Sequence, residues 1–327
     1  MKKNVVIYSN CHGNIIKTMF EKHPFTNKRT NVIYFVNYEN LHKKKLSLEH
    51  LNILKSCDIF IYQPFNNHHD NTEYDIENIK KKLRDDTMII SVNYYRFKGF
   101  WYNCIHFPYE NYEEYKFSNL NNSGLYENIT KISDKNSKKC IKSFIDNIEI
   151  NINELEIAFN NELENFKKID NKSDVNMFDF FKYNYHNTVL FHDPYHPTNF
   201  FFYEIFKQLV KKIFDEDLID KDLIFIESLK KFEMTHWCLP ILPTVKSHFG
   251  LKYPEIYKVF YEGWNPSTLC LNIYDYYYIR LCKKNFELFL KENKLKIFIE
   301  NKFNQEINNQ NLFYLICSLG NIFFSNS

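Results

Sequence analysis

The sequence has few of the small residues that let a backbone approach a bound ligand closely. Among 327 residues there are only 6 glycines, and Ala158 is the single alanine. A glycine-rich loop that cradles phosphate groups needs several glycines at close spacing, and the chain has no such cluster. Aromatic residues make up 18% of the sequence instead, so Phe and Tyr are expected to fill much of the core.

The sequence has no excess of charge of one sign, and it has no long apolar runs. The 42 basic and 40 acidic residues give a net charge of +2, with both signs mixed along the chain. An extended nucleic-acid surface requires clustered basic charge, so no nucleic-acid partner is predicted. No run reaches the roughly 18 apolar residues that a membrane-spanning helix needs, so no membrane span is predicted. Only residues 5–8 are apolar after the basic start, which is too short a run for a secretory signal.

Paired cysteines are missing as well. The eight cysteines are scattered along the chain, and none of them forms a CxxC pair. Reduced thiols therefore fit better than a disulfide framework, and we expect a cytoplasmic protein.

The first half of the chain alternates between apolar runs and helical patterns. Strands are predicted at 4–9, 31–36, 58–63 and 88–92, and helices at 14–21, 47–55 and 75–83. This alternation is typical of a parallel sheet covered by helices on both faces. Further along, the patterns predict a loop over the sheet at 94–126, a fifth strand at 188–192, and helices at 137–147, 153–168, 177–185 and 199–214.

The length allows one large domain with an appendage. We predict an α/β fold with three layers, helix–sheet–helix, over residues 1–230. Residues 231–327 are predicted to form a helical appendage packed on that domain, with one long aromatic helix at 269–290.

A thiol follows the first predicted strand directly. Cys11 lies in the segment Ser-Asn-Cys-His-Gly, between the strand 4–9 and the helix that comes next. A helix N-terminus has partial positive charge from unpaired N–H groups, which favours a thiolate and can stabilise an oxyanion. Cys11 is therefore the candidate nucleophile, although a small buried cysteine would also fit this position.

An acid and an imidazole follow the fifth predicted strand. Asp193 and His196 lie three residues apart in the segment Asp-Pro-Tyr-His-Pro-Thr, and Thr198 is expected to cap the next helix. A carboxylate bonded to one ring nitrogen fixes the tautomer and leaves the other nitrogen free to accept a proton. If His196 and Cys11 lie side by side at one edge of the sheet, the three groups provide nucleophile, base and orienting acid for acyl transfer.

These residues resemble the WcbI-type polysaccharide-biosynthesis family of acetyltransferases. The similar patches, between about residues 4 and 251, are Asn10-Cys11, 58–63 (DIFIYQ), 89–101 (IISVNYYRFKGFW), the His-Pro-Thr at 196–198 and 239–245 (LPILPTV). The Asp-x-x-His pattern also resembles a block of the SGNH hydrolases, with Cys11 where those enzymes have serine. The glutamine usual in the family after Asn-Cys is His12 here, and the glycine of the second SGNH block has no evident counterpart except Gln63.

The resemblance implies an SGNH-like sheet and coenzyme A (acetyl-CoA) as a ligand. It also implies acetyl transfer to a sugar or nucleotide-sugar acceptor in capsule or surface glycan biosynthesis. Ligands of parallel α/β sheets bind outside the carboxyl ends of the strands. The candidate coenzyme A-binding residues near those ends are Asn10, His12, Gln63, Asn93, Arg96 and Lys98.

Three other functions stay open on the same residues. An SGNH-like carbohydrate esterase would deacylate glycans with water. A non-catalytic protein built on an inactivated sheet would instead handle glycans without reaction. A metal site would use His, Cys, Asp or Glu side chains close in sequence, but the available spacings match no zinc pattern, so no metal ligands are predicted. The side chains that lie closest together in sequence for such a site are His186, His192, Asp193 and His196, and separately His68, His69 and Asp70.

Overall fold

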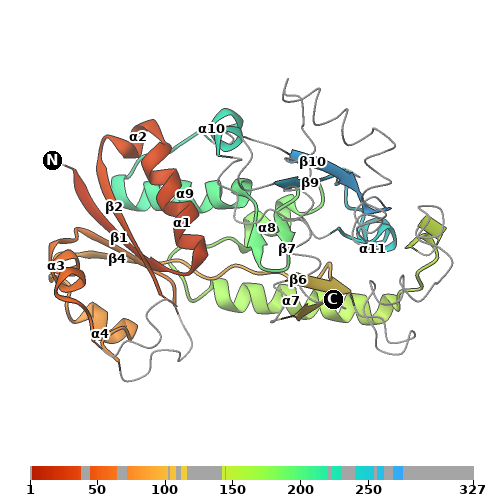
Figure 1. Cartoon of the computed structure of the whole chain (residues 1–327), viewed down its shortest axis with the longest axis horizontal. Coiled ribbons are helices and arrows are strands. Elements are labelled where there is room, and N and C mark those ends of the chain that lie inside the picture. Colours follow the sequence, from red (N-terminus) through yellow and green to blue (C-terminus); the bar gives the residue numbers. More distant parts are fainter. Residues whose placement is uncertain are drawn as a thin grey trace, which may run out of the picture. The chain divides into compact units, whose positions relative to one another are not determined.

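The structure of the chain is a computed structural model (Figure 1). It describes residues 2–37, 45–64, 72–101, 104–107, 112–115, 142–143, 145–219, 222–229, 240–253, 256–260 and 268–274. Contacts group the chain into two units. The first consists of 1–96, 163–185 and 195–234, and the second of 97–162, 186–194 and 235–327. The second unit thus includes two segments that the sequence placed in the first domain, and the domain boundary at residue 230 stays a prediction.

The first unit is built on a parallel four-stranded sheet in the order β2–β1–β3–β4. Its strands are β1 (Lys3–Ser9), β2 (Thr30–Val36), β3 (Ile59–Tyr62) and β4 (Met88–Ser91). All four strands predicted in the first half are therefore present, and the α/β class is confirmed. β1 pairs with neighbours on both sides, which is why its centre is a continuous apolar run that is buried throughout.

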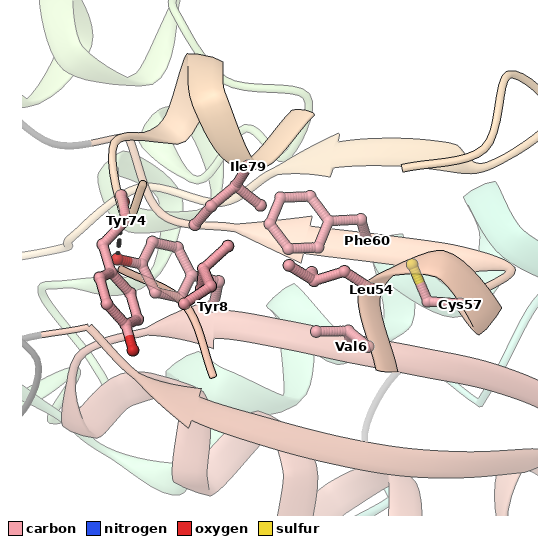
Figure 2. Packing of buried hydrophobic residues seen from close by; sticks show 8 residues of the cluster. Val6, Tyr8, Leu54, Cys57, Phe60, Tyr74 and Ile79 are labelled. Atoms are coloured by element: carbon pink, nitrogen blue, oxygen red, sulfur yellow. Dashed lines mark hydrogen bonds between the residues drawn. The ribbon is translucent and has the colours of Figure 1, made fainter. Parts of the chain in front are cut away.

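Helices cover both faces of this sheet, as predicted (Figure 1). On one face lie α1 (Cys11–Lys22), α2 (Pro24–Asn27), α9 (Asn199–Phe214) and α10 (Leu223–Ser228), and on the other α3 (Leu48–Ser56) and α4 (Ile76–Lys80). Because side chains alternate along a strand, Val6 and Tyr8 of β1 face α3 and α4, where they pack with Leu54 and Ile79 (Figure 2). The hydroxyl of Tyr8 is satisfied there by donating to the Tyr74 carbonyl at 3.0 Å.

A strand does form near the predicted 188–192, as β7 (Phe191–Asp193), but it is not part of this sheet, so its predicted place as a fifth strand of the sheet was wrong. The outer edge of β4 is held instead by the loop after α7 (Ile152–Asp170). The Ser91 N–H donates to the Asp174 carboxylate at 2.7 Å, and the Ser173 hydroxyl donates to the Ser91 carbonyl at 2.8 Å. These bonds occupy the backbone groups that another strand would use. The chain continues through α8 (Phe178–Asn184) to two short strands, β7 (Phe191–Asp193) and β8 (His196–Pro197).

The second unit contains two antiparallel pairs and α11 (Pro243–His248). β5 (Cys104–Phe107) pairs with β6 (Tyr112–Tyr115), and β9 (Ile256–Phe260) pairs with β10 (Thr268–Asn272). The predicted loop at 94–126 therefore includes a hairpin, and the helix predicted at 269–290 is wrong for its first four residues. Aromatic and β-branched residues near these positions favour strands. Residues 275–290 and most of the predicted helix 137–147 lie outside the described residues.

In the part of the chain that the structure describes, no helix combines the length and the apolar character that a bilayer span requires.

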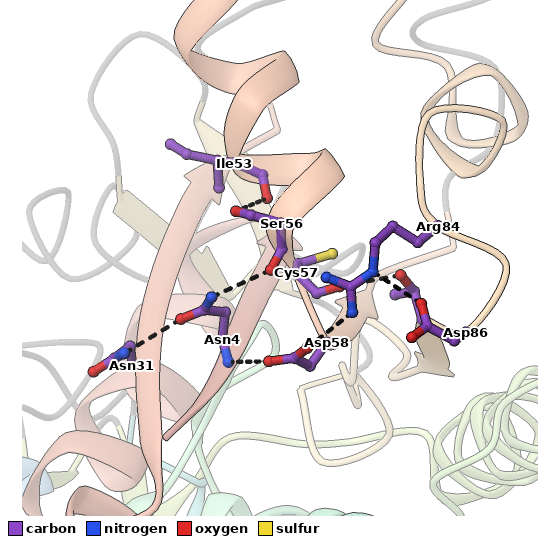
Figure 3. Close-up of polar contacts among 9 residues, drawn as sticks. Asn4, Asn31, Ile53, Ser56, Cys57, Asp58, Arg84 and Asp86 are labelled. Carbon is purple, nitrogen blue, oxygen red and sulfur yellow. Dashed lines mark hydrogen bonds and ion pairs between the residues drawn. The ribbon is translucent and has the colours of Figure 1, made fainter. Parts of the chain in front are cut away.

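A polar network closes the amino edge of the sheet, at the opposite end of β1 from Cys11 (Figure 3). The Asp58 carboxylate accepts the Asn4 backbone N–H at 2.8 Å and the Arg84 guanidinium at 2.9 Å. Arg84 also donates to Asp86 at 2.8 Å. The Asn4 N–H, and next the Arg84 side chain, lower the pKa of Asp58 below its ordinary value of 3.8 because they stabilise the ionised carboxylate.

We expect Asp58→Asn to destabilise the protein at pH 7 by up to about 1 kcal/mol, because the ion pair is partly exposed. A carboxylate whose pKa is lowered in the folded state stabilises the folded protein above pH 3.8, its ordinary pKa. This stabilisation is lost as the pH falls through the folded-state pKa. The deficit should therefore shrink as the pH falls below 3.8, as measured by urea unfolding. Asp85→Asn, at an exposed neighbouring carboxylate, is the matched control. A deficit that did not change with pH would contradict the prediction.

Candidate active site

The turn between β1 and α1 places Cys11 at the start of the helix. Asn10 caps α1, because its Oδ1 accepts the His12 N–H at 3.0 Å and its carbonyl accepts the Gly13 N–H at 2.9 Å. Glycine is required at position 13, since a Cβ there would lie 2.6 Å from the Tyr34 ring. Cys11 is not in a disulfide, and the residue is half-buried and therefore partly open to solvent.

Gln63, the residue after β3, supports this turn from the neighbouring strand. Its amide oxygen accepts the Asn10 N–H at 3.0 Å, the Ser9 hydroxyl at 3.2 Å and the Asn37 side-chain amide at 3.4 Å. Gln63 is only 2% exposed. These bonds fix the position of the turn that holds Cys11, and a contact of Gln63 with coenzyme A stays a prediction.

The helix α9 begins at the same end of the first unit as α1. Thr198 caps α9, as the sequence predicted, by accepting the backbone N–H three residues later. Ring contacts join His12 to Phe202 at 5.2 Å and, further along both helices, Phe20 to Phe206 at 5.2 Å. The two helices therefore run side by side in the same direction. Their N-termini, each with partial positive charge, lie at one end of the unit.

His12 connects the Cys11 turn with the segment that contains His196. Its Nε2 lies 3.2 Å from the carbonyl oxygen of Tyr195, which is 183 positions further along the chain. The His12 ring is 2% exposed, and burial lowers its pKa to about 3, so it is neutral at pH 7. Tyr195 and His196 are half-buried, as Cys11 is. The thiol-bearing turn and the imidazole-bearing segment thus meet at the start of α1, while the chemical roles of Cys11 and His196 stay predictions.

Two further predicted residues lie in the loop after β4. Asn93 is buried, and its side-chain amide donates to the carbonyl of Ile169 at 2.8 Å, which ties this loop to the end of α7. Arg96 is exposed. Of the two, Arg96 is therefore the side chain with freedom to contact a ligand, and neither role in coenzyme A binding is tested.

Lys98 and Asp193 belong to the second unit. The Lys98 backbone N–H donates to the Glu162 carboxylate at 3.2 Å, and Asp193 ends β7 with 8% exposure. Phosphate binding by Lys98 and orientation of His196 by Asp193 stay predictions. Among the described residues, no group of three or more His, Cys, Asp or Glu side chains is placed to hold a metal ion. Residues 68–70 lie outside them.

The sequence interpretation missed Asn37, the supporting role of Ser9 and the part played by Tyr195. Ser9 ends β1 and Asn37 follows β2, and both donate to Gln63. The rule that singled out Gln63 and Asn93, a polar residue closing an apolar strand, would have found them too. Tyr195 contributes a backbone carbonyl, and no residue pattern predicts which carbonyl will meet a distant side chain.

Fold and site together define an α/β protein with a thiol and an imidazole held at the carboxyl edge of a parallel sheet. The profile of the family described as "Polysaccharide biosynthesis enzyme WcbI" matches residues 4–214. That match spans more than half of the chain, so the protein belongs to the WcbI family of polysaccharide biosynthesis enzymes. The family resemblance inferred from the sequence is confirmed.

A solved structure of WcbI has a similar fold. It is described as a novel polysaccharide biosynthesis enzyme, in its native form without a disulfide bond between coenzyme A and a cysteine. The TM-score is 0.58 at 14% sequence identity, and the superposition covers 99% of this chain and 100% of that one. At this identity the likeness establishes the fold alone. No curated protein matches the sequence.

Proposed function

We propose that this chain is a coenzyme A-dependent acyltransferase that moves an acetyl group onto a sugar during polysaccharide assembly. The observation behind the proposal is the contact between the His12 ring and the Tyr195 carbonyl, which brings the Cys11 turn to the His196 segment. Family membership supports the polysaccharide context. Coenzyme A, named together with a cysteine of the related WcbI protein, supports the class of acyl donor.

Several residues that the structure describes are compatible with binding the thioester end of acetyl-CoA. Two helix N-termini at one end of the unit, those of α1 and α9, favour anionic groups and a developing oxyanion. Cys11 and His196 are both half-buried, so each can meet a reactant that enters from solvent. The exposed guanidinium of Arg96 is the candidate for a phosphate contact, since Arg pairs well with phosphate oxygens.

The proposed chemistry moves one proton and one acyl group. His196 accepts the proton of the sugar hydroxyl while the hydroxyl oxygen bonds to the acetyl carbon. The carbon–sulfur bond of the thioester then breaks, and the proton passes to the departing thiolate. Asp193 would orient the imidazole for both transfers. Cys11 acts in one of two ways, either by accepting the acetyl group first as a thioester or by positioning the acceptor.

If Cys11 accepts the acetyl group, Cys11→Ser should lower the rate of acetyl transfer by about 100-fold or more, because a hydroxyl is a much weaker nucleophile than a thiolate at neutral pH. Release of coenzyme A thiol, in the presence of a panel of sugars and nucleotide sugars, measures the rate. Cys57→Ala is the matched control, since Cys57 is fully buried and burial raises its pKa to about 11, which leaves it inert.

The outcomes separate the candidate functions. Full transfer by the Cys11→Ser protein would refute the proposed site. Acetylated Cys11 in a mass spectrum of the protein incubated with acetyl-CoA alone would identify the covalent route. Acetate released without an acceptor as fast as with one would point to hydrolysis, because a transferase has to exclude water from its acyl group.

A further inference from the structure

His12 differs from the other residues of the candidate site because its ring is enclosed. The imidazole lies between the rings of Tyr94, with centroids 4.7 Å apart, and Phe202, at 5.2 Å with the planes perpendicular. Only 2% of the residue is exposed. A ring so enclosed acts on the site through the protein groups that it contacts, while a contact of His12 with coenzyme A stays a prediction.

The hydrogen bonds assign the tautomer of His12. A carbonyl oxygen can only accept, so the Nε2 that lies 3.2 Å from the Tyr195 oxygen must be the protonated nitrogen. Among the described residues, nothing forms a hydrogen bond with Nδ1, which is buried. A proton on Nδ1 would be buried without an acceptor among the described residues, which costs free energy. The ring is therefore held neutral, with its single N–H aimed at Tyr195.

We propose that His12 is a positioning residue whose neutral ring clamps the main chain at Tyr195 and so holds the imidazole of His196 beside the Cys11 turn. The clamp acts on the residue directly before His196, where a small backbone shift would displace the ring. Displacement of about 1 Å at a reacting group can cost on the order of 100-fold in rate.

Packing alone does not account for a histidine here. A phenylalanine would fill the space between the two aromatic rings without burying an Nδ1 that lacks a partner, and such unpaired atoms reduce stability. What phenylalanine cannot supply is the N–H that meets the Tyr195 carbonyl. A buried Nδ1 that lowers stability is expected where the hydrogen bond from Nε2 to the Tyr195 carbonyl is required.

The test compares His12→Phe, which keeps the ring and removes the donor, with His12→Gln, which restores a donor. Hydrogen exchange followed by mass spectrometry reports on the peptide that contains residues 195–198. We expect exchange there to be faster by about 10-fold or more in the Phe variant and near the wild-type rate in the Gln variant. The melting temperature of the Phe variant should equal or exceed that of the wild type, which shows that the change is local.

Kinetics provide the second readout, and this arm rests on the proposed function. The Phe variant should lower kcat by roughly 10- to 100-fold while KM for acetyl-CoA changes by less than about 3-fold, and Gln should restore kcat. Wild-type exchange at 195–198 in the Phe variant would overturn the inference, as would failure of Gln to rescue either readout. If the wild type transferred no acetyl group but the Phe variant still loosened the segment, the proposed function would fail and the clamp would stand.

Discussion

Replacing His196 by alanine is expected to lower the rate of acetyl transfer by about 100- to 10,000-fold, the usual contribution of a well-placed general base. His196 is the half-buried imidazole that follows Tyr195, and the Tyr195 carbonyl is tied to His12 at 3.2 Å. In the proposed mechanism the imidazole takes the proton of the sugar hydroxyl, and alanine cannot do so. On that mechanism the loss should appear in kcat, because the ring would act on the reacting atoms.

The measurement is the initial rate of thiol release at saturating acetyl-CoA, repeated with added imidazole. Free imidazole should partly restore the rate of the His196→Ala protein, since the variant leaves space for it. His50→Gln is the matched control. His50 lies in α3 on the other face of the sheet, with its ring 4.5 Å from that of Phe35, and its replacement should leave kcat unchanged. Wild-type activity in His196→Ala would remove the base from the mechanism.

Acidification from pH 7 to pH 4.5 is expected to destabilise the first unit by roughly 2–3 kcal/mol through His12 alone. Burial lowers the pKa of His12 from 6.5 to about 3. In the unfolded chain the same ring binds a proton near pH 6.5, so the unfolded state holds more protons than the folded state between about pH 6.5 and 3. Stability is therefore full above pH 6.5 and falls steadily as the pH drops toward 3.

His23 should act in the same direction. It is buried against Phe206 and Phe225 with ring centroids 5.3 Å and 4.8 Å away, and burial lowers its pKa. Its Nδ1 accepts the Phe25 N–H at 3.3 Å, so protonation would also break the cap of α2. Protonation of either histidine is therefore expected to destabilise the packing around its ring.

Urea unfolding of the wild type and His12→Gln at several pH values isolates the His12 contribution, because ionisation of the carboxylates is common to both proteins. The free energy of unfolding of the variant, relative to the wild type, should rise by about 2–3 kcal/mol between pH 7 and pH 4.5. A difference that stayed constant over this range would mean that His12 is already accessible to protons in the folded protein.

Much of this fold was predictable because local patterns and the fold agreed. The four strands of the sheet are short apolar runs, each followed by a polar residue or a turn, and the parallel arrangement follows from the helices between them. The helix predicted at 199–214 has the bounds of α9, since Thr198 caps it and its apolar face faces α1. At 188–192 a short strand forms but does not join the sheet, and at 269–272 a strand forms where a helix was predicted, because pairing partners decided both outcomes.

The sequence by itself determined the parallel sheet, the family and the two polar segments around Cys11 and His196, because strand periodicity, helix caps and short motifs are local properties of the chain. Only the tertiary structure decided that those segments meet, and that they do so through the buried ring of His12 and the carbonyl of Tyr195. A backbone carbonyl is the same at every residue. The Tyr195 carbonyl meets the His12 ring, 183 positions away, because α1 packs beside α9, and no local pattern encodes that packing.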